Sequence, residues 1–120
     1  MSKKQVLVVD DQPGIRMLLE EVIKSEGYGV YSAENGSQAL DMIQEKQPDL
    51  TIVDYNLPVM NGGELLKKLD EKNYEKPVIL MTGMAVESLS EESNYPFVRK
   101  VIAKPFNIDD LREDISGMLV

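Results

Sequence analysis

The 120-residue chain contains no cysteine and no histidine. The missing cysteines exclude disulfides, thiolate nucleophiles and zinc–thiolate sites. The missing histidines exclude serine–histidine triads, histidine-ligated metals and a phosphohistidine intermediate on this chain. The chemistry that remains is that of carboxylates, hydroxyls, lysine and a cation that prefers oxygen ligands.

Basic residues and long apolar runs are also scarce. There are 13 Lys and Arg against 21 Asp and Glu, so the formal net charge is −8, and we expect no direct binding to nucleic acid or to an anionic membrane. The first apolar run, residues 6–9, is shorter than the roughly 7–15 residues of a secretory signal core or the roughly 20 of a membrane span. We therefore expect a soluble, cytoplasmic protein, and the length predicts one domain over residues 1–120.

Short runs rich in β-branched residues alternate with amphipathic patterns. The runs predict five strands, over residues 5–9, 29–33, 50–53, 77–81 and 98–103. The first, third and fourth are almost wholly apolar, as in strands covered on both faces, and the mixed second and fifth runs are typical of edges. Helical patterns follow Pro13, residues 35–37, residues 61–63 and Asn107, and a weaker fifth pattern covers residues 86–94. This alternation predicts an α/β fold with a doubly wound, five-stranded parallel sheet in the order 2-1-3-4-5.

Polar residues follow the predicted strands at the edge where a sheet of this kind holds its ligand. Asp10 and Asp11 follow the first strand, Asp54 the third, Thr82 the fourth and Lys104 the fifth. Neighbouring strands lie about 4.8 Å apart, and two carboxylates about 4 Å apart repel by about 4 kcal/mol at an effective dielectric constant of about 20. A single aspartate at such a place most often begins a turn or caps a helix. Three that converge favour a site in which a proton, a cation or the lysine compensates their charge.

This set of side chains predicts magnesium-dependent phosphoryl transfer to a carboxylate. Asp54 is the expected nucleophile because it follows a central strand, and Asp10 and Asp11 are the expected metal ligands. Lys104 and Thr82 would neutralise the phosphoryl oxygens. The ion is expected to be Mg²⁺, with Mn²⁺ plausible, and the phosphoryl donor must be another molecule because the chain has no histidine.

The motifs resemble the receiver domains of two-component response regulators, over essentially the whole chain. The resemblance rests on Val-Val-Asp10-Asp11, on Asp54-Tyr-Asn-Leu-Pro58-Val-Met-Asn-Gly62, on Met81-Thr82-Gly83 and on Lys104-Pro105-Phe106. Further likeness to the single-domain receivers of sporulation phosphorelays lies in Asp10-Asp11-Gln12, Gly14-Ile15-Arg16, Glu26-Gly27-Tyr28 and Gln38-Ala39-Leu40-Asp41. The resemblance implies the flavodoxin-like, CheY-like (βα)5 fold.

The resemblance also implies roles for the site residues. Asp54 would accept a phosphoryl group from the phosphohistidine of a histidine kinase or a His-phosphotransfer protein. Asp11, Asp54 and the main-chain carbonyl of Asn56 would bind Mg²⁺, with Asp10 acting through water. The domain would then hydrolyse its own aspartyl phosphate and act as a timed signalling switch rather than as an enzyme on another substrate.

Two further roles are implied on the phosphate side of the site. Thr82 would move toward the new phosphate, and Lys104 would pair with it. The peptide bond between Lys104 and Pro105 is expected to be cis, which costs little only before proline.

Some positions depart from the family pattern. Val101 stands where many receivers have an aromatic residue that swings inward on activation, and a valine cannot make that move. The side chain of Asn56 is placed to orient a water, so we expect rapid loss of the phosphoryl group. The likeness to sporulation-type receivers implies that the surface formed by Gln12, Gly14, Ile15 and Leu18 docks the phosphodonor. The alternative is that Ile15 and Leu18, at this helical spacing, belong to the core.

Four other interpretations were weighed. A nucleotide-binding protein of the same sheet order needs a loop rich in small residues after the first strand, where this chain has two aspartates. An aspartyl-phosphate hydrolase usually has a second acid two residues after the nucleophile, where this chain has Asn56. A receiver that has lost phosphorylation would be only a docking module, and the 120 residues could be the receiver part of a longer regulator. No motif in the sequence assigns a downstream effector.

Overall fold

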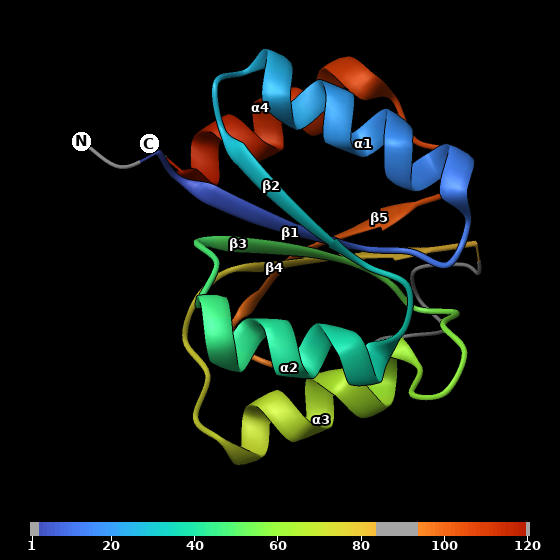
Figure 1. Cartoon of the computed structure of the whole chain (residues 1–120), viewed down its shortest axis with the longest axis vertical. Coiled ribbons are helices and arrows are strands. Elements are labelled where there is room, and N and C mark those ends of the chain that lie inside the picture. Colours follow the sequence, from blue (N-terminus) through green and yellow to red (C-terminus); the bar gives the residue numbers. More distant parts are fainter. Residues whose placement is uncertain (1–2, 84–93, 120) are drawn as a thin grey trace.

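The computed structural model describes residues 3–83 and 94–119, and from β1 to β4 strands alternate with helices (Figure 1). The strands are β1 (Gln5–Val9), β2 (Gly29–Ala33), β3 (Leu50–Asp54), β4 (Val78–Thr82) and β5 (Val98–Ala103). The helices are α1 (Pro13–Ser25), α2 (Gly36–Lys46), α3 (Gly62–Glu71) and α4 (Ile108–Leu119). The helix predicted over residues 86–94 falls almost wholly on residues 84–93, which lie outside the described residues.

The five strands form one parallel sheet in the order β2-β1-β3-β4-β5, which confirms the predicted order. Every residue of β3 and β4 is buried, whereas the edge strands β2 and β5 are partly exposed, as the mixed composition of their sequences indicated. In the register of the central pair, Val9 of β1 lies opposite Val53 of β3. The next residue of each strand is an aspartate, so Asp10 and Asp54 come side by side.

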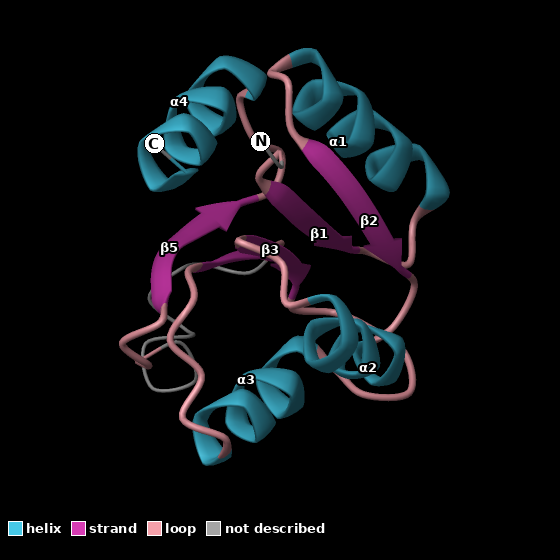
Figure 2. Cartoon of the chain, turned by 60° about the vertical axis from the view of Figure 1, so that its left-hand side comes forward, coloured by secondary structure: helices cyan, strands magenta, loops and turns pink. Residues whose placement is uncertain are grey.

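Helices cover both faces of the sheet: α1 and α4 lie on one face, and α2 and α3 on the other (Figures 1 and 2). Side chains of a strand alternate between the faces. Val6 and Val8 therefore join the core beneath α1 and α4, while Leu7 and Val9 join the core beneath α2 and α3. Among the helices described, none is long and apolar enough to cross a bilayer.

Asparagine side chains begin three of the four described helices. Asn35, Asn61 and Asn107 each accept a hydrogen bond from the backbone N–H three residues later, at 2.9, 2.9 and 3.1 Å. Each such bond satisfies one donor that the first helical turn leaves unpaired. Pro13 is the first residue of α1, and Gly27 follows that helix with a φ of 89°, a left-handed conformation that glycine adopts without strain.

Strands β3 and β4 each end one residue later than the sequence indicated. Asp54 and Thr82 are the last residues of β3 and β4 rather than the first residues after them. The ladder continues because the N–H of Tyr55 donates to the carbonyl of Met81 at 2.8 Å. Both functional candidates are thus held by strand geometry, not by a loop.

Candidate functional site

Three carboxylates meet at the carboxyl edge of the sheet, as the sequence predicted. One oxygen each of Asp10, Asp11 and Asp54 can be chosen so that all three lie within 4.8 Å of one another. Asp10 is fully buried and Asp54 is only 4% exposed, while Asp11 faces solvent. These donors are all oxygens, with one side open to water, which is the ligand environment that Mg²⁺ prefers.

Lys104 neutralises part of this charge. Its Nζ donates to Asp10 Oδ2 at 3.0 Å and to Asp54 Oδ2 at 2.9 Å. The lysine follows β5, where its own N–H donates to the carbonyl of Thr82 at 2.7 Å. The peptide bond that follows, to Pro105, is cis, as predicted. The end of β5 thus directs a long cationic side chain across the ends of β4 and β3 to β1.

Backbone N–H groups bind the second oxygen of each buried acid. The N–H of Gln12 donates to Asp10 Oδ1 at 2.9 Å, and the N–H of Asn56 donates to Asp54 Oδ1 at 3.2 Å. Each bond spans two residues, which is the geometry by which an aspartate side chain starts a turn. Each aspartate can therefore start a turn and serve the site at the same time. The backbone hydrogen bond fixes the orientation of each carboxylate.

The surroundings of the site shift the pKa of both Asp54 and Lys104 upward, for different reasons. Burial raises the pKa of Asp54 above its ordinary value, although hydrogen bonds from Lys104 and Asn56 and the charge of the lysine oppose the rise. Burial acts to lower the pKa of Lys104, but its hydrogen bonds and its attraction to Asp54 and Asp10 outweigh this, and the net shift is upward. A bound divalent cation would favour the ionised form of Asp54 and so oppose the effect of burial.

A pocket of about 280 Å³ opens over the acids, lined by Asp11, Gln12, Asp54, Asn56, Gly83 and Lys104. Thr82 is fully buried at the end of β4, directly before the pocket residue Gly83. All of the predicted site residues thus gather at this edge. Val101 is partly buried and packs against the core beneath α2 and α3.

The surface of α1 beside the acids has a mixed character. Gln12 and Gly14 are exposed, Ile15 packs partly against the core, and Leu18 is 38% exposed. A mainly apolar hollow of about 430 Å³ joins this surface to the lysine loop, and it is lined by Ile15, Leu18, Lys104, Pro105, Phe106 and Ile108. The sequence had identified the helical half of this surface but not the half that follows β5.

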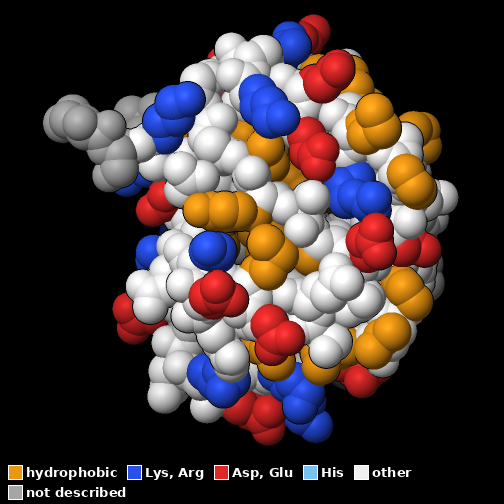
Figure 3. All heavy atoms as spheres, in the orientation of Figure 1, with side chains coloured by type: hydrophobic (Ala, Val, Ile, Leu, Met, Phe, Trp, Pro, Cys, Tyr) orange, Lys and Arg blue, Asp and Glu red, His pale blue; other side chains and the backbone are white. Residues whose placement is uncertain are grey.

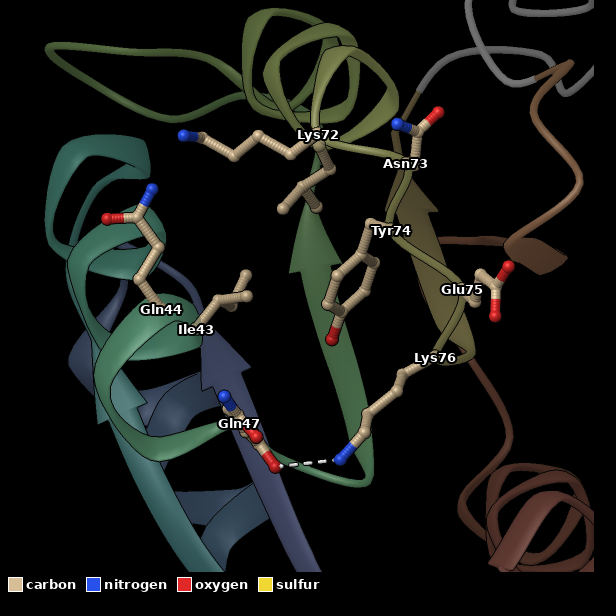
Figure 4. Close-up of a pocket in the computed structure, with 9 residues that line it drawn as sticks. Ile43, Gln44, Gln47, Lys72, Asn73, Tyr74, Glu75 and Lys76 are labelled. Atoms are coloured by element: carbon tan, nitrogen blue, oxygen red, sulfur yellow. Dashed lines mark hydrogen bonds between the residues drawn. The ribbon is translucent and has the colours of Figure 1, made fainter.

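A larger hollow, of about 520 Å³, lies at the opposite end of the sheet, between the last turns of α2 and α3 (Figure 4). Its inner wall includes Ile43 and the ring of Tyr74, and at its rim Lys76 Nζ donates to the carbonyl of Gln47 at 3.1 Å. It holds a single acid, Glu75. Nothing in its lining matches the converging charges at the other end.

Charged side chains of both signs are interspersed on the face of the molecule that Figure 3 shows. No stripe of lysine and arginine runs across this face.

Two residues that contact the acid-bearing loops were not predicted as site residues. Arg16 donates from Nη1 to the backbone carbonyl of Asp10 at 2.8 Å, and the N–H of Gly36 donates to the carbonyl of Met60 in the loop after Asp54 at 3.1 Å. In the sequence, Arg16 stands out only as part of the motif Gly14-Ile15-Arg16. Neither contact leaves a local pattern in the sequence.

A five-stranded parallel sheet of this order, with an acidic triad and a lysine at its carboxyl edge, defines a receiver-type signalling domain. The comparison with known families agrees: the model of the response regulator receiver domain matches residues 6–116, and the chain belongs to this family.

Curated and solved relatives agree with this assignment. The chain is 40% identical to sporulation initiation phosphotransferase F of Bacillus subtilis, over 99% of this chain and 96% of the relative. It is 34% identical to the response regulator TrrA of Thermotoga maritima, solved in complex with Mg²⁺ and BeF, with a TM-score of 0.86 over 97% of this chain and 99% of that one. A receiver domain from Methanospirillum hungatei is 33% identical, with a TM-score of 0.90 over 98% of this chain and 94% of that one.

Proposed function

We propose that residues 1–120 act as one receiver domain in which Asp54 accepts a phosphoryl group from the phosphohistidine of a partner. The observation that supports this most directly is the meeting of three carboxylates with Lys104 Nζ, which lies 2.9 Å from Asp54 Oδ2. The similarity to a protein named a sporulation initiation phosphotransferase favours a phosphorelay partner, either a histidine kinase or a His-phosphotransfer protein.

The transfer step needs little chemistry from the receiver beyond position and charge. A carboxylate oxygen of Asp54 attacks the phosphorus, the new P–O bond forms, and the P–N bond to the partner's imidazole breaks. The electron pair of that bond returns to the imidazole nitrogen. The receiver's contribution is to hold the carboxylate in line and to neutralise the charge on the three equatorial oxygens.

The proposed metal ligands are Asp11, Asp54 and the main-chain carbonyl of Asn56, with Asp10 binding through water. The arrangement fits Mg²⁺ because the acids converge and Asp11 faces solvent, which leaves room for water ligands. Binding of Mg²⁺ with BeF by the Thermotoga relative supports the same use of the pocket here. Mn²⁺ takes the same oxygen ligands. When bound, the ion supplies positive charge to the phosphoryl oxygens.

Lys104 and Thr82 complete the proposed site. The ammonium of Lys104 bridges Asp10 and Asp54 in this structure, and we expect it to transfer one of these contacts to a phosphoryl oxygen. Thr82 ends the neighbouring strand, where its hydroxyl is expected to approach the same group. The rearrangement of these two residues is the proposed switch. It involves no inward movement of an aromatic ring at position 101, because that residue is a valine.

The aspartyl phosphate is expected to be short-lived. Water attacks the phosphorus, the P–O bond to Asp54 breaks, and inorganic phosphate leaves while the carboxylate is restored. Asn56 lines the pocket and is exposed, so its amide can hold the attacking water.

The proposed docking surface for the phosphodonor is formed by Gln12, Gly14, Ile15 and Leu18. It borders the acids, and the apolar hollow at Leu18 offers area that a helical partner could bury. We expect Leu18→Asp to slow phosphoryl transfer from a cognate phosphohistidine protein at least tenfold, and Met17→Asp, one position along α1, to change it little. Equal rates in both variants would contradict this surface.

The experiment that tests the proposed function is intact-mass spectrometry after incubation with Mg²⁺ and acetyl phosphate. The wild type and Asp41→Ala, which removes an exposed aspartate of α2, should each gain one phosphoryl group. Asp54→Ala, and wild type without Mg²⁺, should gain none. In the same assay followed over time, Asn56→Lys should keep the adduct longer than wild type.

Two results would contradict the proposed phosphorylation of Asp54. No adduct on wild type, together with no response of amide resonances to beryllofluoride, would make the protein a docking module rather than a phosphorylated switch. An adduct that persists in Asp54→Ala would move the acceptor to another residue.

A further inference from the structure

The segment from the last residue of β2 to the first residue of α2, Ala33 to Gly36, contacts both acid-bearing loops. On the β1 side, the N–H of Asp10 donates to the carbonyl of Ala33 at 3.2 Å. On the β3 side, the N–H of Gly36 donates to the carbonyl of Met60 at 3.1 Å. Met60 lies in the loop that begins after Asp54. This segment therefore lies against both loops, on the side of the sheet where they emerge (Figure 1).

Arg16 extends this connection on the β1 side. Its guanidinium donates from Nη1 to the carbonyl of Asp10 at 2.8 Å, and its Nη2 lies 3.5 Å from Glu34 Oε1. The arginine side chain is 16% exposed, so it is largely packed in place. One side chain thus connects the backbone beside the first acids with the turn that leads to α2.

The turn itself is held in one conformation. Asn35 Oδ1 accepts the N–H of Gln38 at 2.9 Å, and Gln38 Oε1 accepts the N–H of Glu34 at 2.9 Å. These reciprocal bonds resemble a capping box, which orders the entry of a chain into a helix. The contacts on its two sides are therefore connected through a rigid segment.

The contact at Gly36 is too close for any side chain. A Cβ added there would lie 2.1 Å from the carbonyl oxygen of Met60, a backbone atom that a side-chain rotation cannot move. Glycine at this position permits the loop after Asp54 to approach the first turn of α2. An alanine would force the loop that contains Asn56 and Met60 and the first turn of α2 apart.

The loop also contains a backbone conformation that needs support. Val59 has a φ of 67° and is 82% exposed, and the N–H of Met60 donates to the carbonyl of Pro58 at 2.7 Å. A β-branched residue in the left-handed region costs roughly 1–3 kcal/mol. The exposed valine side chain gains little packing in return, so contacts of its neighbours, including that of Met60 with Gly36, must hold the turn.

We propose that Arg16, Glu34, Gly36 and Met60 form a brace that positions the two acid-bearing loops and so sets the affinity of the pocket for Mg²⁺. These are positioning residues, because none of them belongs to the proposed metal ligands. The proposal rests on the proposed function in that it assumes Mg²⁺ binding at Asp11, Asp54 and Asn56. Groups of this kind behind a metal site typically change its affinity about 10–100-fold when they are removed.

The test is the Mg²⁺ dissociation constant, measured on the metal alone by titration of amide resonances. Gly36→Ala should raise it about tenfold or more. The matched control is Gly117→Ala, where an added methyl group meets nothing within 4 Å, and its dissociation constant should equal that of wild type. Ala39→Gly, a buried change in the same helix, provides a variant that loses stability without touching the loop.

Arg16→Met gives the sharper result and serves if Gly36→Ala does not fold. It removes a positive charge near an acidic pocket, so simple electrostatics predicts tighter Mg²⁺ binding, whereas the brace predicts weaker binding. Tighter or equal binding in Arg16→Met would overturn the proposal, as would a loss of affinity in Ala39→Gly as large as that in Gly36→Ala. If wild type itself fails to bind Mg²⁺, the proposed function fails instead.

Discussion

The two ends of the sheet deal with polar groups in opposite ways. At the amino end the charged groups Asp49 and Lys76 have separate partners: Asp49 Oδ2 accepts the N–H of Gln5 at 2.7 Å, and Lys76 donates to the backbone carbonyl of Gln47 at 3.1 Å. At the carboxyl end the charged groups face one another, and Lys104 is shared between two buried acids. The larger hollow lies at the amino end, so crowding of charge, not volume, identifies the functional end.

Removing the shared cation, Lys104, should have the largest effect on the contrast between the two ends. Lys104→Met leaves Asp10 and Asp54 buried without it, and breaking a buried pair in this way typically costs about 3–5 kcal/mol. Because burial already raises the pKa of Asp54, the folded variant should bind a proton more readily than the unfolded chain. The loss should therefore shrink as the pH falls from about 7 toward about 5, measured as the difference in unfolding free energy from wild type.

The control for this change is Lys100→Met. Lys100 pairs with Asp114 at 2.9 Å, but it lies on the exposed side of β5, where ion pairs contribute little. Denaturant unfolding should show little change. If both lysine variants lost the same stability, the contrast between a shared buried cation and an ordinary surface pair would be wrong.

Mg²⁺ should stabilise the carboxyl end alone. An ion that binds only the folded state adds about 2.7 kcal/mol when its concentration is 100 times the dissociation constant, so the thermal midpoint of wild type should rise. Asp11→Asn should abolish most of this rise, whereas Asp49→Asn, at the amino end, should keep it. Retention of the full response by Asp11→Asn would place the metal elsewhere.

The smallest effect is expected at the amino end, at Tyr74. Burial raises the pKa of its phenol; the nearby hydroxyl of Thr51 offsets part of this and the charge of Asp49 adds to it. The two hydroxyls form no hydrogen bond of regular geometry. The folded state therefore favours the neutral phenol, and stability should be lost only as the pH rises above about 10.

Tyr74→Phe should accordingly change stability by less than about 1 kcal/mol at neutral pH, and it should reduce the alkaline loss. Urea midpoints on both sides of pH 10 give the measurement, with Tyr31→Phe on the edge strand β2 as the control. A large loss at neutral pH would show that the phenol is paired, and the contrast between the two ends would weaken.

The sequence predicted the parts of this molecule that depend on local pattern. The strand runs and the acids at the ends of β1 and β3 leave periodic or adjacent signals, and the sheet order brings those acids together. The predicted strands β3 and β4 ended one residue too early because Asp54 and Thr82 are polar. The ladder of the sheet depends instead on backbone hydrogen bonds, which continue past these residues.

The rest depends on contacts between segments far apart in the chain. Gly36 and Met60 are joined only by the packing of α2 against a loop, and nothing near either residue indicates the other. The segment before β5, residues 94–97, likewise depends on a contact with a distant residue. In the structure its Phe97 is buried, stacks on Tyr95 and meets the edge of the Tyr74 ring.

The register that pairs Val9 with Val53 limits where residues can be inserted into this chain or deleted from it. Deleting one residue from β1 or β3 would shift an acid along the sheet and turn the side chains behind it to the opposite face. Residues 71–73, at the exposed end of α3, can be lengthened or shortened without altering that pairing. Insertions and deletions in descendants of this chain should therefore collect at the amino end of the sheet, while the strands that hold the acids keep their length.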